Sequence, residues 1–401
     1  MVTGFFPDAI SMSNSCGLCN EPSLDEVYSP ERSTRGIKIH LCRHCGLVQS
    51  LPRIDRAPRR AAAVSSGADW GNVRYGKGFR TKAALDAIGR HTDLSREISV
   101  LDVGSNRGSF ARAFLNAAPK AHLVAVEPDE RVVNSCAGFE RTELVHARIE
   151  STALETDRFD IVHSCHTIEH LADPARVLAD HWRTLKRDGL LVIDAPSTEF
   201  LGSDDVVEEW FIDKHLFHFS PRTLTRMIEM AGFEIVEGPD RADRENLLIV
   251  ARKVATPPPI FGHDHGEAAH AEDLITTYVA TRARNLMALT AVAAEIAAMK
   301  SRRVAMWGAG RIFDSLVVHG NFDARGLALL IDKHLKALVP ERHGCEVQAP
   351  EALETADAGV VIVMSRSFAP EIVNEARRLA PSAEILLYSD LLAQARTRMA
   401  A

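Results

Sequence analysis

Two pairs of cysteines near the start of the chain have the spacing of a metal-binding site. Cys16 and Cys19 form one C-x2-C pair, and Cys42 and Cys45 form the other. Two tight turns of this kind bring four thiolates to one ion in a closed tetrahedral site, which leaves no position for water or substrate. The doubled pattern therefore predicts a structural zinc ion bound by these four residues. The alternatives are a redox dithiol and unrelated buried cysteines.

A second group of chemically useful residues surrounds a glycine turn. Asp102 lies at the end of a short apolar run, Gly104 permits a sharp turn, and Gly108 lets a helix begin close to a ligand. Asn106 stands where a dinucleotide-binding loop has its middle glycine, so the G-x-G-x-x-G motif fits poorly. The next apolar run ends in Glu127, whose carboxylate can accept both ribose hydroxyls of an adenosine. We therefore expect an adenosine-containing ligand at this turn.

The two following apolar runs end in residues suited to the same ligand. Arg148-Ile149-Glu150 after the third run can contact adenine, and the fourth run ends near Cys165. Together with Glu169-His170-Leu171-Ala172-Asp173-Pro174, these features resemble the class I S-adenosylmethionine-dependent methyltransferases over about residues 70–250. The resemblance implies S-adenosylmethionine as the cofactor, whereas a dinucleotide-dependent oxidoreductase is the alternative. The expected cofactor contacts are Asp102, Gly104, Ser105, Asn106, Gly108, Glu127, Pro128, Ile149, Glu150 and Cys165.

Several histidines lie where a catalytic base would be needed. His215 lies in a loop after the fifth apolar run, near the expected carboxyl ends of the strands. Its unperturbed pKa of about 6.5 suits a general base. A purely structural role is the alternative, and it is the preferred interpretation for His218. His166 is the second catalytic candidate, while Glu169 and His170 are expected to orient the loop.

Alternating strand and helix patterns position these residues. Across residues 61–254 they predict a Rossmann-like α/β domain with a parallel sheet, whose ligands bind beyond the carboxyl ends of the strands. Strands are expected at 98–103, 123–126, 144–147, 159–163 and 190–193, and helices at 109–117, 174–185 and 221–231.

A proline-rich stretch at residues 255–270 predicts a linker to a second Rossmann-like α/β domain at 271–401. That domain is expected to contain a helix at 275–299 and strands at 303–307, 327–331, 360–364 and 385–388. Gly308-Ala309-Gly310-Arg311 could receive a phosphate, and Asp332 a ribose, but a degenerate domain without ligand is the alternative. A solvated linker is preferred over metal binding for the linker histidines His263, His265 and His270.

The complete layout is a zinc-binding module at residues 1–60, the methyltransferase domain and the C-terminal domain. It resembles the sugar C-methyltransferases that act on nucleotide-linked 4-keto-6-deoxyhexoses. The resemblance rests on the four cysteines with the following Gly46-Leu47-Val48-Gln49, and on Trp307-Gly308-Ala309-Gly310-Arg311 with Ile331-Asp332-Lys333. In that family a loop histidine removes a proton beside the keto group, and the enolate takes the methyl group. His215 aligns with that histidine.

Some neighbours depart from the family pattern. Ile212 stands where the family has tyrosine, Lys214 where it has glutamate, and a tyrosine-rich segment is reduced to Tyr75. The resemblance implies C-methylation of a nucleotide-linked sugar, and the departures leave open O- or N-methylation of another small metabolite. An oxidoreductase using the C-terminal glycine turn and an inactive binding protein are the remaining alternatives.

Composition limits the partners. The formal net charge of −7 shows no basic excess of the kind that nucleic-acid binding requires. The longest apolar runs fall short of the roughly 20 residues that span a bilayer, and the first residues lack the pattern of a signal peptide. We therefore expect a cytoplasmic protein with reduced thiols and a small-molecule substrate, with neither a nucleic acid nor a membrane as its partner.

Overall fold

The computed structural model describes residues 14–31, 33–53, 78–130, 132–255, 260–336 and 339–400. These residues form three sheets, of four, seven and six strands. Tyr75 and the prolines at 257–259 lie outside the described residues. None of the described helices has the length and apolar character needed to cross a bilayer.

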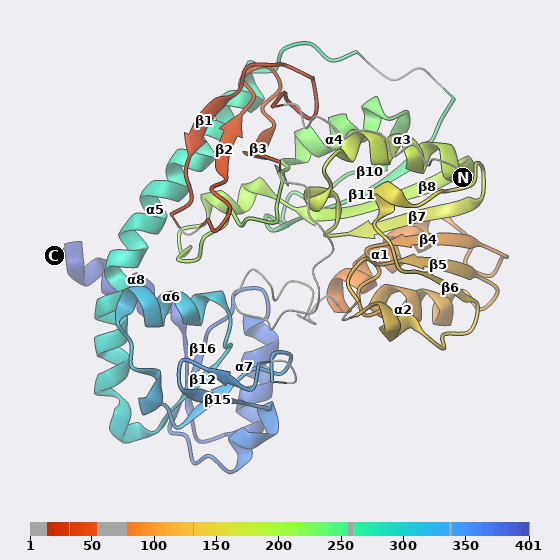
Figure 1. Ribbon diagram of the computed structural model, residues 1–401. Helices are drawn as coiled ribbons and strands as arrows, with labels where there is room; N and C mark the ends of the chain where they lie inside the picture. Colours follow the sequence, from red (N-terminus) through yellow and green to blue (C-terminus); the bar gives the residue numbers. More distant parts are fainter. Residues whose placement is uncertain are drawn as a thin grey trace, which may run out of the picture.

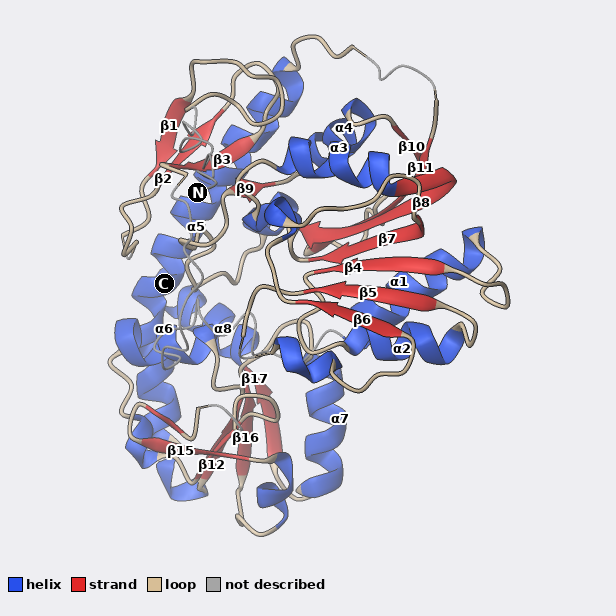
Figure 2. Ribbon diagram, turned by 45° about the vertical axis from the view of Figure 1, so that its right-hand side comes forward, coloured by secondary structure: helices blue, strands red, loops and turns tan. Residues whose placement is uncertain are grey.

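The middle sheet has the order β10-β11-β8-β7-β4-β5-β6. Its strands are β4 (Ser99–Val103), β5 (His122–Val126), β6 (Thr142–Val145), β7 (Phe159–Cys165), β8 (Leu185–Pro196), β10 (Phe233–Glu237) and β11 (Asn246–Lys253). Helices α1 (Gly78–His91) and α2 (Ser109–Ala117) cover one face, and α3 (Pro174–Thr184) and α4 (Pro221–Met230) cover the other (Figure 2). Each face of the sheet packs against its helices through a separate cluster of buried apolar residues.

The prediction of a parallel sheet is correct for β4 to β8 but wrong for β11. That strand runs antiparallel to both β8 and β10. A short connection joins β10 directly to β11, and a short connection permits only a hairpin, because parallel neighbours need a long crossover. The predicted strand at 190–193 is also longer in the structure, since β8 spans twelve residues.

The N-terminal sheet draws one of its strands from a distant part of the chain. It consists of β1 (Asp25–Tyr28), β2 (Lys38–Leu41), β3 (Val48–Leu51) and β9 (Phe217–His218). Strand β9 follows His215 directly and pairs with β3 through Val48 and Gln49. The sheet formed between and after the two cysteine pairs therefore includes a strand that belongs to the segment with the candidate base.

The third sheet has the order β14-β15-β13-β12-β16-β17. Its strands are β12 (Val304–Trp307), β13 (Leu329–Ile331), β14 (Glu341–Arg342), β15 (Cys345–Gln348), β16 (Val360–Val363) and β17 (Glu384–Leu387). Helices α6 (Arg311–Gly320), α7 (Ala369–Leu379) and α8 (Tyr388–Ala400) belong to the same part of the chain. The strands from β15 to β17 are parallel, and β14 is antiparallel to β15.

One long helix, α5 (His265–Ala298), connects these parts of the molecule (Figure 1). It contacts β1 and β2 near its start and α6 and α8 further along. At about 1.5 Å per residue, its 34 residues span roughly 50 Å. The Asp264 carboxylate caps the first turn by accepting from the Glu267 amide, so residues 265–270 are helical where the sequence predicted a linker.

Candidate active site and zinc centre

The structure brings the four predicted zinc ligands together. The Sγ atoms of Cys16 and Cys45 lie 3.5 Å apart, as do those of Cys19 and Cys42. All four sulfurs lie within 4.8 Å of one another. Four thiolates around one zinc ion, each at about 2.3 Å, would be separated by about 3.8 Å in a tetrahedron. The donor set and the spacing therefore fit a zinc ion.

Two glycines let the turns that contain the C-x2-C pairs pack closely against the rest of the protein. Gly46 has a φ of 78°, and a Cβ at this position would lie 2.8 Å from the backbone carbon of Glu267 in α5. A Cβ on Gly17 would collide with the ring of Phe217 in β9. Because both contacts require the absence of a side chain, the two C-x2-C turns pack directly against α5 and β9.

The glycine turn after β4 has the predicted form. Gly104 and Gly108 both have a φ of 73°, and Gly108 precedes the first turn of α2. A Cβ on Gly104 would collide with the hydroxyl of Thr167, which follows β7. Asn106, at φ 49°, donates its backbone N–H to Glu127 Oε2 at 2.8 Å. The turn is thus held directly to the carboxylate at the end of β5.

Two buried polar atoms at this turn fit an absent ligand. Asp102 Oδ1 lies 2.8 Å from His163 Nδ1, while the buried Asp102 Oδ2 has no partner among the described residues. Within the same described part of the chain, the buried hydroxyl of Ser105 also has none. An ammonium group and a hydroxyl of a cofactor would satisfy these atoms, since buried polar atoms are normally hydrogen-bonded.

Burial changes the chemistry of Glu127. Its carboxyl is 5% exposed, and burial raises its pKa to about 7. The backbone amides of Asp129 and Asn106 donate to it and oppose that rise. Pro128, by contrast, is exposed. Glu127 is therefore close to half-ionised at neutral pH, and its ionised form accepts hydrogen bonds most strongly.

The remaining predicted cofactor residues lie in η3 (Ile149–Ser151), which follows β6, and at the end of β7. Ile149 is buried in the apolar layer, and Glu150 pairs with Arg148 at 3.0 Å. Cys165, the last residue of β7, lies 3.6 Å from Asp194 Oδ2 in β8. All the strands that carry these residues are parallel, so their carboxyl ends meet at one edge of the sheet.

His166 is held by residues that the sequence analysis did not single out. Its backbone N–H donates to the Asp194 carbonyl at 2.7 Å, and its ring Nε2 contacts the Arg80 guanidinium. Arg80 also forms an ion pair with Asp194 at 3.0 Å. The signal for Asp194 was present in the sequence, as a carboxylate directly after the fifth apolar run at 190–193. Arg80 had no such signal, because its partners are distant in the chain.

The loop that carries His215 lies beside the short helix η4 (Ile168–His170) at the same edge of the sheet. The rings of His215 and His170 have their centroids 4.8 Å apart. Burial lowers the pKa of His215 well below its usual value, and the nearby His170 lowers it further. His215 is therefore neutral at pH 7, which leaves a nitrogen lone pair able to accept a proton or bind a cation.

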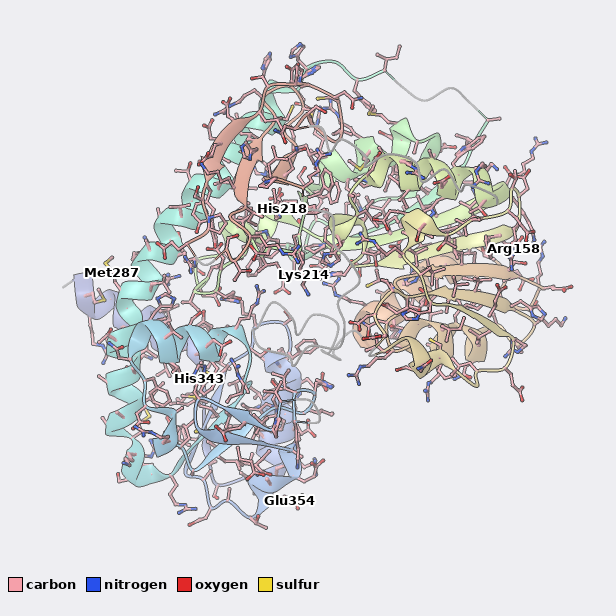
Figure 3. The ribbon with its side chains drawn as sticks, in the orientation of Figure 1. Arg158, Lys214, His218, Met287, His343 and Glu354 are labelled. Atoms are coloured by element: carbon pink, nitrogen blue, oxygen red, sulfur yellow. The ribbon has the colours of Figure 1, made fainter. Side chains whose placement is uncertain are left out.

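His218 is buried and contacts a neighbouring strand. It is 4% exposed, and its Nε2 lies 3.0 Å from the Ser50 hydroxyl. Burial lowers the pKa of His218 to about 3. Ser50 also donates to the His215 carbonyl at 2.8 Å, so this residue of β3 contacts both β9 and the loop before it. Figure 3 shows Lys214 and His218 near the middle of the molecule.

At the C-terminal glycine turn, both residues predicted to bind a nucleotide have contacts within the protein. The Nη1 atom of Arg311 donates to the Glu209 carbonyl at 3.0 Å. The Asp332 carboxylate accepts from the amides of Ala309, His334 and Leu335.

Comparison with known proteins identifies the part of the chain that contains the middle sheet. Residues 77–238 match the family model described as a methyltransferase domain. A Mycolicibacterium smegmatis protein named "Probable S-adenosylmethionine-dependent methyltransferase" is 26% identical over 139 residues, which are 34% of this chain and 52% of that protein. A Mycolicibacterium gilvum protein named "Uncharacterized methyltransferase" is 34% identical over 118 residues, 28% of this chain and 46% of its own length.

The chain thus spans about half the length of these two relatives. The crystal structure of an S-adenosylmethionine-dependent methyltransferase from Aquifex aeolicus covers 45% of this chain and 100% of its own, with 16% identity and a TM-score of 0.36. The family match covers the glycine turn, the strand end at Glu127 and the loop with His215. Residues 77–238 are therefore similar to a methyltransferase domain.

Proposed function

We propose that this protein uses S-adenosylmethionine to methylate a carbon atom of a nucleotide-linked 4-keto deoxysugar. In this proposal the cofactor binds at the glycine turn, between Asp102 and Glu127, and the cysteine cluster binds a structural zinc ion. The proposed organisation is a zinc module at 1–60, the methyltransferase domain at 61–254, a linker that ends where α5 begins at His265, and a C-terminal domain.

The observation that carries the proposal is the position of His215. Its loop is fixed to η4, because the Leu216 amide donates to the Glu169 carbonyl at 2.8 Å. The ring thus lies at the edge of the sheet where a methyl donor bound at Asp102 and Glu127 would end. A neutral imidazole there can remove the proton beside a ketone, and the enolate then attacks the methyl group in line with the departing sulfur.

Lys214 favours a second candidate, O- or N-methylation of another small metabolite. It stands where the sugar C-methyltransferases have a glutamate, and it replaces a negative charge beside the acceptor with a positive one. In this alternative His215 removes a proton from a hydroxyl or an amine, and carbon-bound hydrogen does not exchange with solvent.

The test is product mass after incubation with methyl-labelled S-adenosylmethionine and a panel of nucleotide-linked 4-keto deoxyhexoses in deuterated water. We expect a labelled product, and deuterium at the carbon beside the ketone in the sugar recovered without a methyl group, because in the product the methyl group replaces the proton that His215 removes. His215→Ala should abolish turnover and leave cofactor affinity intact, while His122→Ala, an exposed histidine at the start of β5, should change neither. If the protein binds the cofactor tightly but forms no labelled sugar, the keto-sugar hypothesis is rejected and methyl transfer to another acceptor remains.

A further inference from the structure

We propose that Asp194 binds a hydroxyl group of the acceptor, beside the methyl donor. This role rests on the proposed function, because the hydroxyl belongs to the sugar that is methylated. Asp194 lies near the carboxyl end of β8 and pairs in register with Cys165, the last residue of β7. Figure 2 shows that β4, β7 and β8 end at the same edge of the sheet. Ligands of such sheets bind beyond this edge, so Asp194 lies where an acceptor can be held.

Only one oxygen of the Asp194 carboxylate is used within the described part of the chain. Oδ2 accepts from Arg80 Nη1 at 3.0 Å, and the Cys165 thiol lies 3.6 Å from the same oxygen. Oδ1 is buried and has no hydrogen-bond partner among the residues that the structure describes. The residue as a whole is only 4% exposed. Because a buried oxygen without a donor costs free energy, we expect a ligand to supply a donor to Oδ1.

The charges around Asp194 select the kind of donor. A carboxylate paired with an arginine accepts hydrogen bonds, so the ligand group must carry an O–H or an N–H. The Arg80 side chain, which pairs with Asp194, is only 11% exposed. An ammonium group at Oδ1 would place a second buried cation beside one carboxylate, and an uncompensated buried charge is costly. A neutral hydroxyl satisfies Oδ1 without adding charge, whereas a ketone oxygen has no proton to donate.

The position of Asp194 in the sheet separates it from the cofactor turn. Asp102 pairs in register with His163, and His163 pairs with Val192. Side chains alternate along a strand, so Asp194, two residues after Val192, points to the same face as Asp102. Strand β7 lies between β4 and β8, so about 10 Å of sheet width separates the two carboxylates. One ammonium group cannot contact both, and in the proposed complex Asp102 receives the ammonium of the cofactor.

The segment that carries His215 contacts the same end of β8. Ser197, which directly follows β8, forms a parallel bridge with Phe219. The Thr198 amide also donates to the Phe219 carbonyl at 2.8 Å. The carboxyl end of β8 therefore joins Asp194 to the segment with the candidate base. A sugar hydroxyl held by Asp194 would turn the carbon beside the ketone towards His215 and the methyl group.

The test uses nucleotide-linked hexoses from which one ring hydroxyl at a time has been removed, each with and without the 4-keto group. Calorimetry measures their binding to the full-length protein loaded with S-adenosylhomocysteine, and product mass measures methyl transfer from labelled S-adenosylmethionine. The wild-type protein should bind one deoxy analogue roughly ten- to a hundredfold more weakly than its parent, since a charge-assisted hydrogen bond is lost.

Asp194→Asn should lose most of this preference, because it keeps the shape of the side chain and removes its charge. Its affinity for S-adenosylhomocysteine should stay unchanged, which also shows that the variant has folded. Asp188→Asn is the matched control, because Asp188 belongs to the same strand and its side chain is 72% exposed. This control should keep the full preference.

Equal affinity of the wild-type protein for every analogue that binds would overturn the hydroxyl site without any variant. A preference that Asp194→Asn retains in full would also overturn it. Weaker binding of S-adenosylhomocysteine to Asp194→Asn, with unchanged acceptor affinity, would assign Asp194 to the cofactor instead. A lower kcat with unchanged acceptor affinity would make Asp194 a base, against the proposal.

The same panel separates the hydroxyl site from the proposed reaction. If binding depends on a hydroxyl and on Asp194 but no keto sugar is methylated, the hydroxyl site stands and the proposed reaction fails. If keto sugars are methylated whichever hydroxyl is missing, the reaction stands and the hydroxyl site fails. If no hexose of the panel binds, both are overturned.

Discussion

At the scale of single residues, burial sets the properties of the candidate site. Glu127 keeps a raised pKa because water is excluded from it, although two backbone amides donate to its oxygens. A carboxylate in this position has its highest affinity for hydroxyl donors when it is ionised. Asp102 and Ser105 each keep one buried polar atom available for a ligand, within the part of the chain that the structure describes.

Cofactor affinity should depend on pH through Glu127. Because the pKa is about 7, the dissociation constant of S-adenosylmethionine should rise roughly tenfold per pH unit below that value. Glu127→Gln should weaken binding by about 1.5–3 kcal/mol at pH 8, since it removes a charge-assisted hydrogen bond. Its affinity should also become independent of pH. Calorimetry from pH 5.5 to 8 tests this, and a flat wild-type profile would contradict the assignment.

In the ligand-free protein, the stability contributed by Glu127 should fall as pH rises, whereas cofactor affinity rises with pH. Because the folded pKa of Glu127 exceeds the unfolded value of 4.5, the folded state binds more protons between these values. The stability from this residue is therefore fully present below about pH 4.5 and is lost as pH rises through 7. Glu127→Gln should remove that part of the pH dependence in thermal unfolding.

At the scale of elements, β3 and β9 connect the cysteine cluster to the candidate base. The cluster contacts Phe217 through Gly17, and Arg53 lies over the Phe217 ring with 4.9 Å between its guanidinium carbon and the ring centroid. Small metal-binding modules gain much of their folding free energy from the ion. An ordered cysteine cluster is therefore a condition for an ordered His215 loop.

Cys42→Ser should disturb the His215 loop without disturbing the cofactor site. We expect loss of one zinc equivalent, a lower melting temperature and little or no methyl transfer, because β3 no longer supports β9. S-adenosylmethionine should still bind, since Asp102 and Glu127 lie on β4 and at the end of β5. Cys345→Ser, which alters a partly buried cysteine of the third sheet, is the matched control. Normal turnover in a zinc-free Cys42→Ser protein would show that the two segments are uncoupled.

At the scale of the whole molecule, α5 and a buried ion-pair network join the third sheet to the methyltransferase domain. Arg366 follows β16 and pairs with Glu208 and Asp205, which lie between β8 and β9. Burial by itself raises the pKa of Glu208, but the charge and hydrogen bonds of Arg366 outweigh it and lower the pKa to about 2. The ionised pair therefore persists well below neutral pH.

Arg366→Ala should destabilise the protein by about 3–5 kcal/mol, because it leaves a buried carboxylate without its cation. Urea unfolding followed by tryptophan fluorescence measures this, with Arg378→Ala as the control because Arg378 is 65% exposed. Since the pKa of Glu208 is lowered, the wild-type contribution should be present above about pH 4.5 and lost as pH falls towards 2. An effect as small as that of Arg378→Ala would show that the network does not stabilise this junction.

The sequence by itself determined the features that depend on local pattern. Helix α2 begins and ends at the predicted residues, and the strands before Gly104 and Glu127 lie where the apolar runs placed them. The cysteine cluster followed from spacing alone, because two C-x2-C turns leave few other arrangements. Periodicity, glycine turns and ligand spacing act over a few residues, so they can be recognised without the fold.

Tertiary structure alone decided the contacts between distant segments. The antiparallel direction of β11, the addition of β9 to the N-terminal sheet and the pairing of Arg80 with Asp194 have no local signal. The same holds for the cluster of Glu169 and His170 with His215, which lie far apart in the sequence. Each of these contacts forms because burial of apolar surface on the sheets brings two distant segments together. The free energy of that burial depends on the whole folded chain and not on any local sequence.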